Sequence, residues 1–431
     1  MAHFITAPDP APLPLPPGII SRQIDLSAYG HLSYHILEAG APTDPLIILL
    51  HGFPELAFSW RKVILPLANA ASAPSENRRR RGYHVIAPDQ RGFGRTTGWD
   101  SRHYEQVDLH NFTTTMYVRD TIALVNALGY SKVECIVGHD AGAVTAAACA
   151  TIRPDVFKSV VLLTHPFSGM PRLPFNTVDI QGSSSFPPAS AGIAAPSIND
   201  KLRVYNRKHY KWYYSTHEAN ADMAGPTTAG GLREFLRGYF HVKSASSKGN
   251  NPHPLINKAE SSRQLEWPMD EVVKMPYYYI MPLEATMPQA IERLMTDEPH
   301  DASKDWLPDE DLEVYVNEYA RTTFQGGLNW YRAQTADGDK KPELRHDLDI
   351  FSGKRITIPC AFIGGEKDWG TYQQPGAIEK MTGEEKEVCD DFRMFRMVEG
   401  AGHWIPQEKP DEVVQAILEL EMKQRKYQVN E

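Results

Sequence analysis

The stretch "KVECIVGHDAGAVTAAACATI", residues 132–152, decides the fold. Its first part is a short apolar run, as expected of a strand buried on both faces, and its second part is an alanine-rich segment of helical composition. Asp140 stands at the junction, inside the small-residue sequence "GHDAGA". Small neighbours allow a strand to turn sharply into a helix and hold the central side chain in a strained, exposed position. The stretch therefore predicts a strand, a tight turn and a helix, with an acid at the top of the turn.

The same strand-and-helix pattern extends to both sides of this stretch. Near-continuous apolar runs predict buried strands at residues 45–52, 83–89 and 157–166. Residues 117–129 have the apolar spacing of a helix, with a glycine as its natural end. Strands that alternate with helices predict an α/β fold with a mostly parallel, doubly wound sheet.

Two shorter segments precede this alternation. Residues 21–26 and 31–38 predict a pair of antiparallel strands joined by the turn "SAYG".

The alternation breaks after the fourth apolar strand and returns only near the end of the chain. Residues 170–340 are rich in aromatic residues and proline, whereas strand and helix patterns resume at 356–368, 392–404 and 410–427. Ligands bind at the carboxyl ends of the strands in open α/β sheets, so an insertion here predicts a largely helical cap over those ends. We therefore expect a proline-rich arm at 1–18, core segments at 19–169 and 341–431, and the cap at 170–340.

Composition narrows the range of partners. The 431 residues carry a formal net charge of −9, which disfavours nucleic acid or an anionic membrane surface. The one basic cluster, "NRRRRG" at residues 77–82, is expected to be a solvated loop, with nucleic-acid binding as the less favoured alternative. No stretch has the length and apolarity of a membrane span, and the start of the chain lacks the features of a secretory signal. Four cysteines without a Cys-x-x-Cys pair predict buried thiols in a reducing, cytoplasmic setting.

A lone Asp at a strand–helix junction is more simply explained as a helix N-cap, but three further motifs favour a catalytic role for Asp140. "HGFPE" (51–55) places the backbone N–H of Phe53 at a strand end, where it and the N–H of Ala141 would form a two-donor oxyanion hole. "GGEKD" (364–368) presents Asp368, and "GAGHW" (400–404) presents His403. Each group follows a predicted strand, so all of them converge on one edge of the sheet, in the order nucleophile, acid and histidine.

These residues carry a resemblance to a known family. "HGFPE", "FSWR" (58–61), "APDQRGFGRT" (87–96), "GHDAGA" and "GAGHW" resemble the core motifs of epoxide hydrolases with the α/β-hydrolase fold, over residues 45–168 and 355–427. The resemblance implies that the bond before Pro54 is cis and that two cap tyrosines bind the epoxide oxygen. "GGLNWYRA" (326–333) assigns one to Tyr331. "KHYKWYYS" (208–215) assigns the other to Tyr210, with Tyr213 and Tyr214 as alternatives. Further residues expected to line the substrate site are Pro54, Trp330, Tyr214 and Trp404.

The resemblance implies a reaction in two steps. An ionised Asp140 attacks an epoxide carbon and forms an ester, while Tyr210 and Tyr331 donate to the oxygen. Water activated by His403 and Asp368 then hydrolyses the ester to a vicinal diol. A hydrophobic epoxide and water are the expected partners, no metal or organic cofactor is expected, and a homodimer is compatible with the sequence.

One departure from the family and three alternatives accompany this prediction. Many relatives have Trp directly after the nucleophile, where this chain has Ala141, so a wider pocket is expected beside Asp140. A dehalogenase would use the same Asp, His and acid, but it needs side-chain donors for a halide, and Phe53 and Ala141 offer none. A catalytically silent binding protein would tolerate a missing triad member, but the sequence offers all three members. A serine esterase is the weakest alternative, because no serine occupies the turn.

Overall fold

The computed structural model describes all residues except 1–8, 31, 71–81, 172, 174–196, 226–230, 256–267, 300, 302, 384–385 and 429–431. The arginine run at 78–81 and most of the low-complexity loop of the insertion therefore lie outside the described residues. Within the predicted arm, residues 9–18 form neither helix nor strand.

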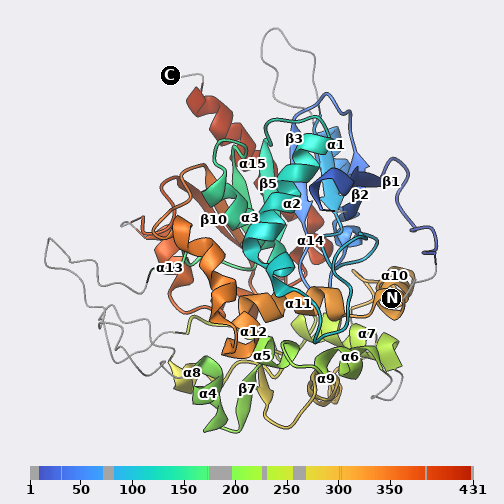
Figure 1. Ribbon diagram of the computed structural model, residues 1–431, viewed down its shortest axis with the longest axis vertical. Coiled ribbons are helices and arrows are strands. Elements are labelled where there is room, and N and C mark those ends of the chain that lie inside the picture. Colours follow the sequence, from blue (N-terminus) through green and yellow to red (C-terminus); the bar gives the residue numbers. More distant parts are fainter. Residues whose placement is uncertain are drawn as a thin grey trace, which may run out of the picture.

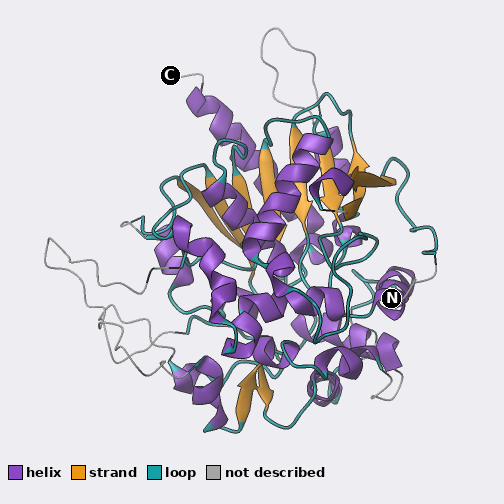
Figure 2. Ribbon diagram, in the orientation of Figure 1, coloured by secondary structure: helices purple, strands orange, loops and turns teal. Residues whose placement is uncertain are grey.

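An eight-stranded sheet forms the centre of the molecule (Figure 2). Its order is β1-β2-β4-β3-β5-β6-β9-β10, with antiparallel pairing of β1 with β2 and of β2 with β4 and parallel pairing elsewhere. The strands are β1 (Ile20–Leu26), β2 (Leu32–Ala39), β3 (Leu46–Leu50), β4 (His84–Pro88), β5 (Cys135–His139), β6 (Val160–Leu163), β9 (Cys360–Gly365) and β10 (Phe392–Val398). The predicted parallel sheet with an antiparallel pair at its start is confirmed.

Helices cover both faces of this sheet, because alternate residues of the central strands point in opposite directions. In β3, Ile48 and Leu50 pack in one hydrophobic cluster with α2 (Thr114–Ala127) and α3 (Ala141–Ile152). Ile47 and Leu49 pack in a second cluster on the other face, with α1 (Ile64–Asn69) and α15 (Pro410–Gln428). Figure 1 shows α2 and α3 lying across the near face of the sheet. The expected doubly wound arrangement follows.

The segment between β6 and β9 is mostly helical, as predicted. Its helices gather at one end of the sheet (Figure 1). Its elements are α4 (Ile198–Arg203), β7 (Arg207–His209), α5 (Tyr210–Tyr214), α6 (Ala219–Ala224), α7 (Gly231–Lys243), α8 (Met269–Val272), β8 (Ile280–Pro282), α9 (Met287–Met295), α10 (Asp309–Thr322), α11 (Gln325–Gln334) and α12 (Ala336–Asp339). The strands β7 and β8 form a separate antiparallel pair.

The remaining helical elements are short and lie in the connections. They are η1 (Ser27–Tyr29), η2 (Ala57–Trp60), η3 (Leu109–Phe112), η4 (Pro342–Phe351), η5 (Trp369–Tyr372), α13 (Ala377–Thr382) and α14 (Ile405–Glu408).

Ion pairs and a large aromatic cluster hold the helical segment on the sheet. Arg61 binds Asp311 at 2.6 Å, and Arg95 binds Glu318 at 2.8 Å, so α10 is tied to the loops after β3 and β4. A third hydrophobic cluster joins residues of the sheet edge, such as Phe53, to residues of the helical segment. The carboxyl ends of the parallel strands are therefore covered.

The four cysteines are buried free thiols, as expected. In the part of the chain that the structure describes, no helix has the length and apolarity needed to cross a bilayer.

Candidate active site

Asp140 occupies the sharp turn between β5 and α3. Its backbone adopts φ 53° and ψ −117°, a strained conformation for a residue with a side chain, and its side chain does not cap α3. A Cβ atom on Gly142 would lie 2.3 Å from the carbonyl oxygen of Leu50, and one on Gly138 would lie 2.2 Å from that of Gly142. The small residues therefore permit the close approach of strand and helix that raises Asp140 above the sheet.

A backbone donor binds the Asp140 carboxylate. The N–H of Phe53 donates to its Oδ1 atom at 3.1 Å, from the loop that follows β3. Ala141 is the first residue of α3, so its N–H belongs to the unpaired donors of a helix N-terminus. The Phe53–Pro54 peptide bond is cis, as the resemblance implied. Of the two groups expected to form an oxyanion hole, the Phe53 N–H contacts the acid, and the Ala141 N–H follows it directly in the chain.

Asp368 and His403 complete the cluster. The Nδ1 atom of His403 lies 3.0 Å from Oδ1 of Asp368, and its Nε2 atom lies 3.5 Å from Oδ2 of Asp140. Asp368 is held in turn by the N–H of Gly370 at 2.7 Å. All three side chains are buried. Asp368 and His403 lie 228 or more positions from Asp140 in the sequence. The strands β9 and β10 nevertheless bring both residues to the sheet edge where Asp140 lies.

The electrostatics keep Asp140 ionised. Burial alone opposes the charge, but the neighbouring His403, Lys243 and His139 outweigh it and hold the pKa of Asp140 well below its usual range. A carboxylate that needs no base for activation is a ready nucleophile.

A second ion pair lies behind the cluster, and sequence reasoning missed it. The Nδ1 atom of His139 lies 2.5 Å from Glu55, and its Nε2 atom lies 2.7 Å from the carbonyl oxygen of His403. Burial opposes both charges, yet mutual attraction raises the pKa of His139 and lowers that of Glu55. Both residues sit inside motifs that the sequence did show, "HGFPE" and "GHDAGA". Their position next to functional residues was the available signal.

Two tyrosines of the helical segment lie in the same hydrophobic cluster as Ala141, the residue after Asp140. Tyr210 begins α5 and Tyr331 lies in α11, and their ring centroids are 5.9 Å apart. Burial, and after it the charge of Asp140, raises the pKa of both hydroxyls well above the ordinary value. Both therefore stay protonated as donors. The hydroxyl of Tyr210 also donates to Gln373 at 3.3 Å.

The alternatives to Tyr210 are engaged elsewhere. The hydroxyl of Tyr213 donates to Asp222 at 2.9 Å, and that of Tyr214 donates to Tyr239 at 3.1 Å. The Tyr214 ring nevertheless packs against the Tyr331 ring, with ring centroids 4.9 Å apart. The Tyr213 and Tyr214 hydroxyls thus have shorter hydrogen bonds than the 3.3 Å contact of Tyr210, and the Tyr214 ring packs edge-on against that of Tyr210.

The other residues predicted to line the site also gather here. Trp330 packs edge-on against Tyr331, with ring centroids 4.8 Å apart. Trp404 packs against His403, with ring centroids 4.6 Å apart. Pro54 follows the Phe53 donor directly. Ala141 is buried in the same hydrophobic cluster as Phe53 and the cap tyrosines, with no bulky group at its position.

Glu408 ties the His403 loop to the segment after α7. Its carboxylate accepts from the N–H groups of Ala245, Gly402 and Trp404 at 2.8, 3.0 and 2.9 Å. Burial raises the pKa of Glu408 to about 7 in spite of these donors. The loop that carries the histidine is thereby fixed to the segment after α7.

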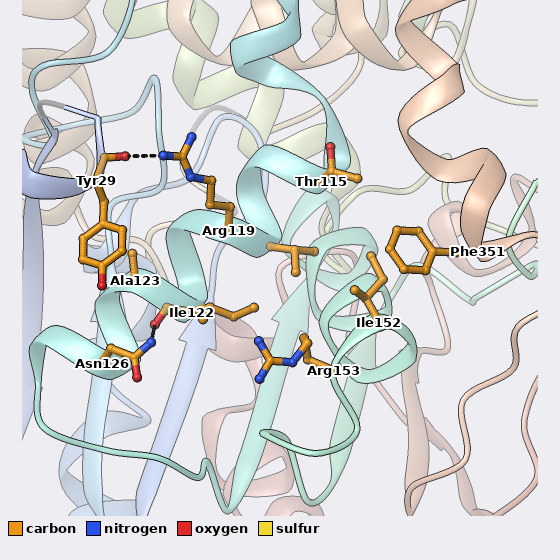
Figure 3. Close-up of a pocket in the computed structure, with 10 residues that line it drawn as sticks. Tyr29, Thr115, Arg119, Ile122, Ala123, Asn126, Ile152, Arg153 and Phe351 are labelled. Atoms are coloured by element: carbon orange, nitrogen blue, oxygen red, sulfur yellow. Dashed lines mark hydrogen bonds between the residues drawn. The ribbon is translucent and has the colours of Figure 1, made fainter.

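A separate hollow of about 380 Å³ lies away from this cluster (Figure 3). Side chains of α2, including Arg119 and Ile122, form one wall, and Ile152, Arg153 and Phe351 form the other. Ile152 ends the helix that starts beside Asp140, so the length of α3, roughly 18 Å, separates the two places. The hollow is therefore no part of the site around Asp140. In the described part of the chain, His, Cys, Asp and Glu form no group of three or more that could hold a metal ion.

The chain is similar over most of its length to proteins of one family. The family described as "alpha/beta hydrolase fold" matches residues 45–410. The chain is 30% identical to epoxide hydrolase A of Mycobacterium tuberculosis over 89% of this chain and 92% of that protein. Among solved structures, an epoxide hydrolase from an endophytic Streptomyces matches with a TM-score of 0.65 and 26% identity, over 95% of this chain and 97% of the other. Epoxide hydrolase I of potato (Solanum tuberosum) matches with a TM-score of 0.63 and 25% identity, over 94% and 99%.

Proposed function

This chain belongs to the epoxide hydrolases of the α/β-hydrolase fold family, and from that premise we propose that it opens a hydrophobic epoxide to a vicinal diol through an ester on Asp140. The observation that carries the proposal is the gathering of two buried, protonated tyrosines, 5.9 Å apart between ring centroids, in one cluster with Phe53 and Ala141 beside a buried, ionised aspartate. That pairing suits a substrate that must be attacked at carbon and stabilised at oxygen in the same step.

The first step uses the charge of Asp140. An oxygen of its carboxylate attacks an epoxide carbon from the side opposite the C–O bond, and that bond breaks as the new one forms. Negative charge develops on the epoxide oxygen, where Tyr210 and Tyr331 donate hydrogen bonds, and one of them supplies the proton. The product of this step is an ester between Asp140 and the substrate.

The second step removes the ester. His403, oriented by its 3.0 Å contact with Asp368, accepts a proton from water, and the hydroxide attacks the carbonyl carbon of the Asp140 ester. The N–H groups of Phe53 and Ala141 stabilise the oxyanion, which collapses and breaks the ester C–O bond. The departing diol oxygen takes the proton from His403, and the proton left on the Asp140 carboxyl returns to the tyrosine that gave one up, so the starting state of the site is restored. The geometry supports this because the Phe53 N–H already points at Oδ1 of Asp140.

The same groups fit an oxygen leaving group better than a halide. A dehalogenase would require side-chain donors beside the nucleophile, and the residues at those positions, Phe53 and Ala141, have none. The tyrosines, in contrast, can both donate to an alkoxide and give it a proton.

Turnover in heavy-oxygen water tests the ester route. After many turnovers, we expect ¹⁸O in the carboxylate of Asp140, detected by mass analysis of the peptide that contains it. Enzyme kept in the same water without epoxide serves as the control and stays unlabelled. An unlabelled Asp140 in enzyme that has turned over would rule out the ester.

Residues 170–340 are proposed to act as a cap that excludes bulk water from the reacting groups, since this segment supplies both tyrosines. The four buried free thiols support the proposal of a cytoplasmic location, where such thiols stay reduced. Water is the second substrate, and a homodimer remains part of the proposal.

A further inference from the structure

Lys243 is buried among aromatic rings beside the candidate active site. It is the last residue of α7 and only 3% exposed. Its Nζ atom lies 4.8 Å from the centroid of the Tyr279 ring, 5.1 Å from that of Tyr239, 5.4 Å from that of Trp404 and 5.7 Å from that of Tyr278. Rings at such distances attract an ammonium group through their negative faces. We call these four rings and Lys243 the lysine cage.

The lysine has an unusual balance of contacts for a buried charge. Buried lysines are commonly paired with a carboxylate, but among the described residues no carboxylate lies within ion-pair distance of Lys243. Its hydrogen bond runs to the hydroxyl of Tyr239 at 3.5 Å. The rings therefore supply most of the contact that the ammonium group has lost with water.

On one side, the cage touches the residues of the second step. The N–H of His403 donates to the carbonyl oxygen of Lys243 at 2.9 Å. Trp404, a wall of the cage, packs on the His403 ring and donates to the carbonyl oxygen of Phe240 in α7 at 2.8 Å. The position of the histidine thus depends on the end of α7 that carries the lysine.

On the other side, the cage touches the residues of the first step. The carbonyl oxygen of Tyr279 accepts from the N–H of Tyr210 at 2.9 Å, and the two rings are 5.2 Å apart. The hydroxyl of Tyr239 accepts from Tyr214, whose ring packs against Tyr331. One lysine therefore lies where the supports of both tyrosines and of the histidine meet.

We propose that Lys243 is a positioning residue of the reaction, a caged cation that fixes the histidine and the tyrosine pair relative to each other and offsets the negative charge that moves between Asp140 and the tyrosines. The inference rests on the proposed function and deepens it. Negative charge moves from Asp140 to the epoxide oxygen in the first step and returns to Asp140 when the ester is hydrolysed. A fixed cation in a cage that contacts Tyr210, Tyr214 and His403 favours an anion on the neighbouring groups.

The charged and titratable groups around the cage make its effect measurable. They come from every element packed on it and comprise Asp140, Asp368, His403, Glu408, Tyr210, Tyr239, Tyr278 and Tyr279. A cation lowers the pKa of each neighbouring acid and of each neighbouring protonated base. Removal of the Lys243 charge should therefore move both the acidic and the alkaline limb of the pH–rate profile toward higher pH.

The test is a comparison of pH–rate profiles for the single-turnover formation and hydrolysis of the ester. K243M keeps the length of the side chain and removes its charge. We expect both limbs of its profile to shift upward by about one pH unit, the size given by charges on the order of 10 Å apart in a protein. K243R keeps the charge and should return the limbs to the wild-type position. The exposed Lys248 offers a control in the following loop, because K248M removes one lysine charge outside the cage.

An upward shift in K243M that K243R reverses and K248M lacks supports the inference. A K243M profile with both limbs at their wild-type pH overturns it, and so does an equal shift in K243R. If K243M fails to fold by near-ultraviolet circular dichroism, K243Q replaces it with a shorter neutral side chain and the same expectation. Failure of the proposed function would look different, since the wild-type enzyme itself would then form no diol.

Discussion

The Nε2 atom of His403 lies 3.5 Å from Oδ2 of Asp140, while its Nδ1 atom lies 3.0 Å from Asp368. The imidazole thus faces the carboxylate that would become an ester, with the opposite nitrogen held by an acid. This arrangement suits the proposed role of His403 as the base of the second step, and it leaves Asp140 as the nucleophile of the first.

Replacing His403 by glutamine should separate the two steps. We expect H403Q to react once with epoxide and to accumulate the ester, with turnover reduced by about 10²- to 10⁴-fold, because no base remains to activate water. Intact-protein mass spectrometry after quenching would show the added mass of one substrate. The exposed His110 provides a control, and H110Q should turn over normally. Normal turnover by H403Q would assign the base elsewhere.

The two tyrosines should govern the first step. Y210F and Y331F each remove one donor to the developing alkoxide, so ester formation should slow by roughly 10- to 100-fold in each variant. Single-turnover kinetics would measure this step directly. Tyr213 is the matched control, since its hydroxyl donates to Asp222 and Y213F should form the ester at the wild-type rate. A Y213F defect equal to that of Y210F would shift the assignment along α5.

The pair of Glu55 and His139 should matter for stability. Both side chains are fully buried, and removal of one partner leaves the other without its counter-charge. We therefore expect E55Q to lose about 3 kcal/mol in the free energy of unfolding, measured with a chemical denaturant. E134Q breaks the more exposed pair of Glu134 and Lys158 and should cost less than about 1 kcal/mol. Equal stability of the two variants would contradict this prediction.

His209 should make the protein acid-sensitive. Burial, helped by Lys211, lowers the pKa of His209 to about 3. Below pH 6.5 the unfolded chain binds a proton that the folded protein does not, so stability falls as the pH falls, by up to about 1.4 kcal/mol per pH unit. Asn at this position keeps an acceptor for the N–H of Lys211 but does not titrate. The stability of H209N should therefore decline less between pH 7 and 5. If the free energy of unfolding declines equally with pH in H209N and in the wild-type protein, His209 is not the source of the acid sensitivity.

The sequence predicted the sheet and the groups at its edge because both depend on local patterns. Phe53, Asp140, Asp368 and His403 each follow a parallel strand, and parallel strands bring their carboxyl ends to one edge. The positions along the edge then follow from the strand order. The place of Tyr331 could not be predicted in this way, because no comparable rule places a residue of a helical segment at the site. For Tyr331, the prediction rested on the flanking residues of the family motif.

What the sequence could not predict depends on contacts between distant elements. Lys243 ends an amphipathic helix and reads as an ordinary surface lysine until Trp404, 161 positions later, closes over it. Tyr278 and Tyr279 are buried aromatic residues of the insertion, yet Tyr279 also supports Tyr210. Hydrophobic periodicity reports burial, but it does not report which neighbour a ring meets.

The pairing of β6 with β9 has a consequence for how the protein is made. Val160 pairs with Cys360, although 200 positions separate them, because the whole helical segment lies between the two strands. A ribosome therefore releases Asp140 and its donors long before it releases the strand that carries Asp368 and the loop that carries His403. Nascent chains hold the nucleophile without its base, and hydrolytic turnover becomes available only once the last two strands join the sheet.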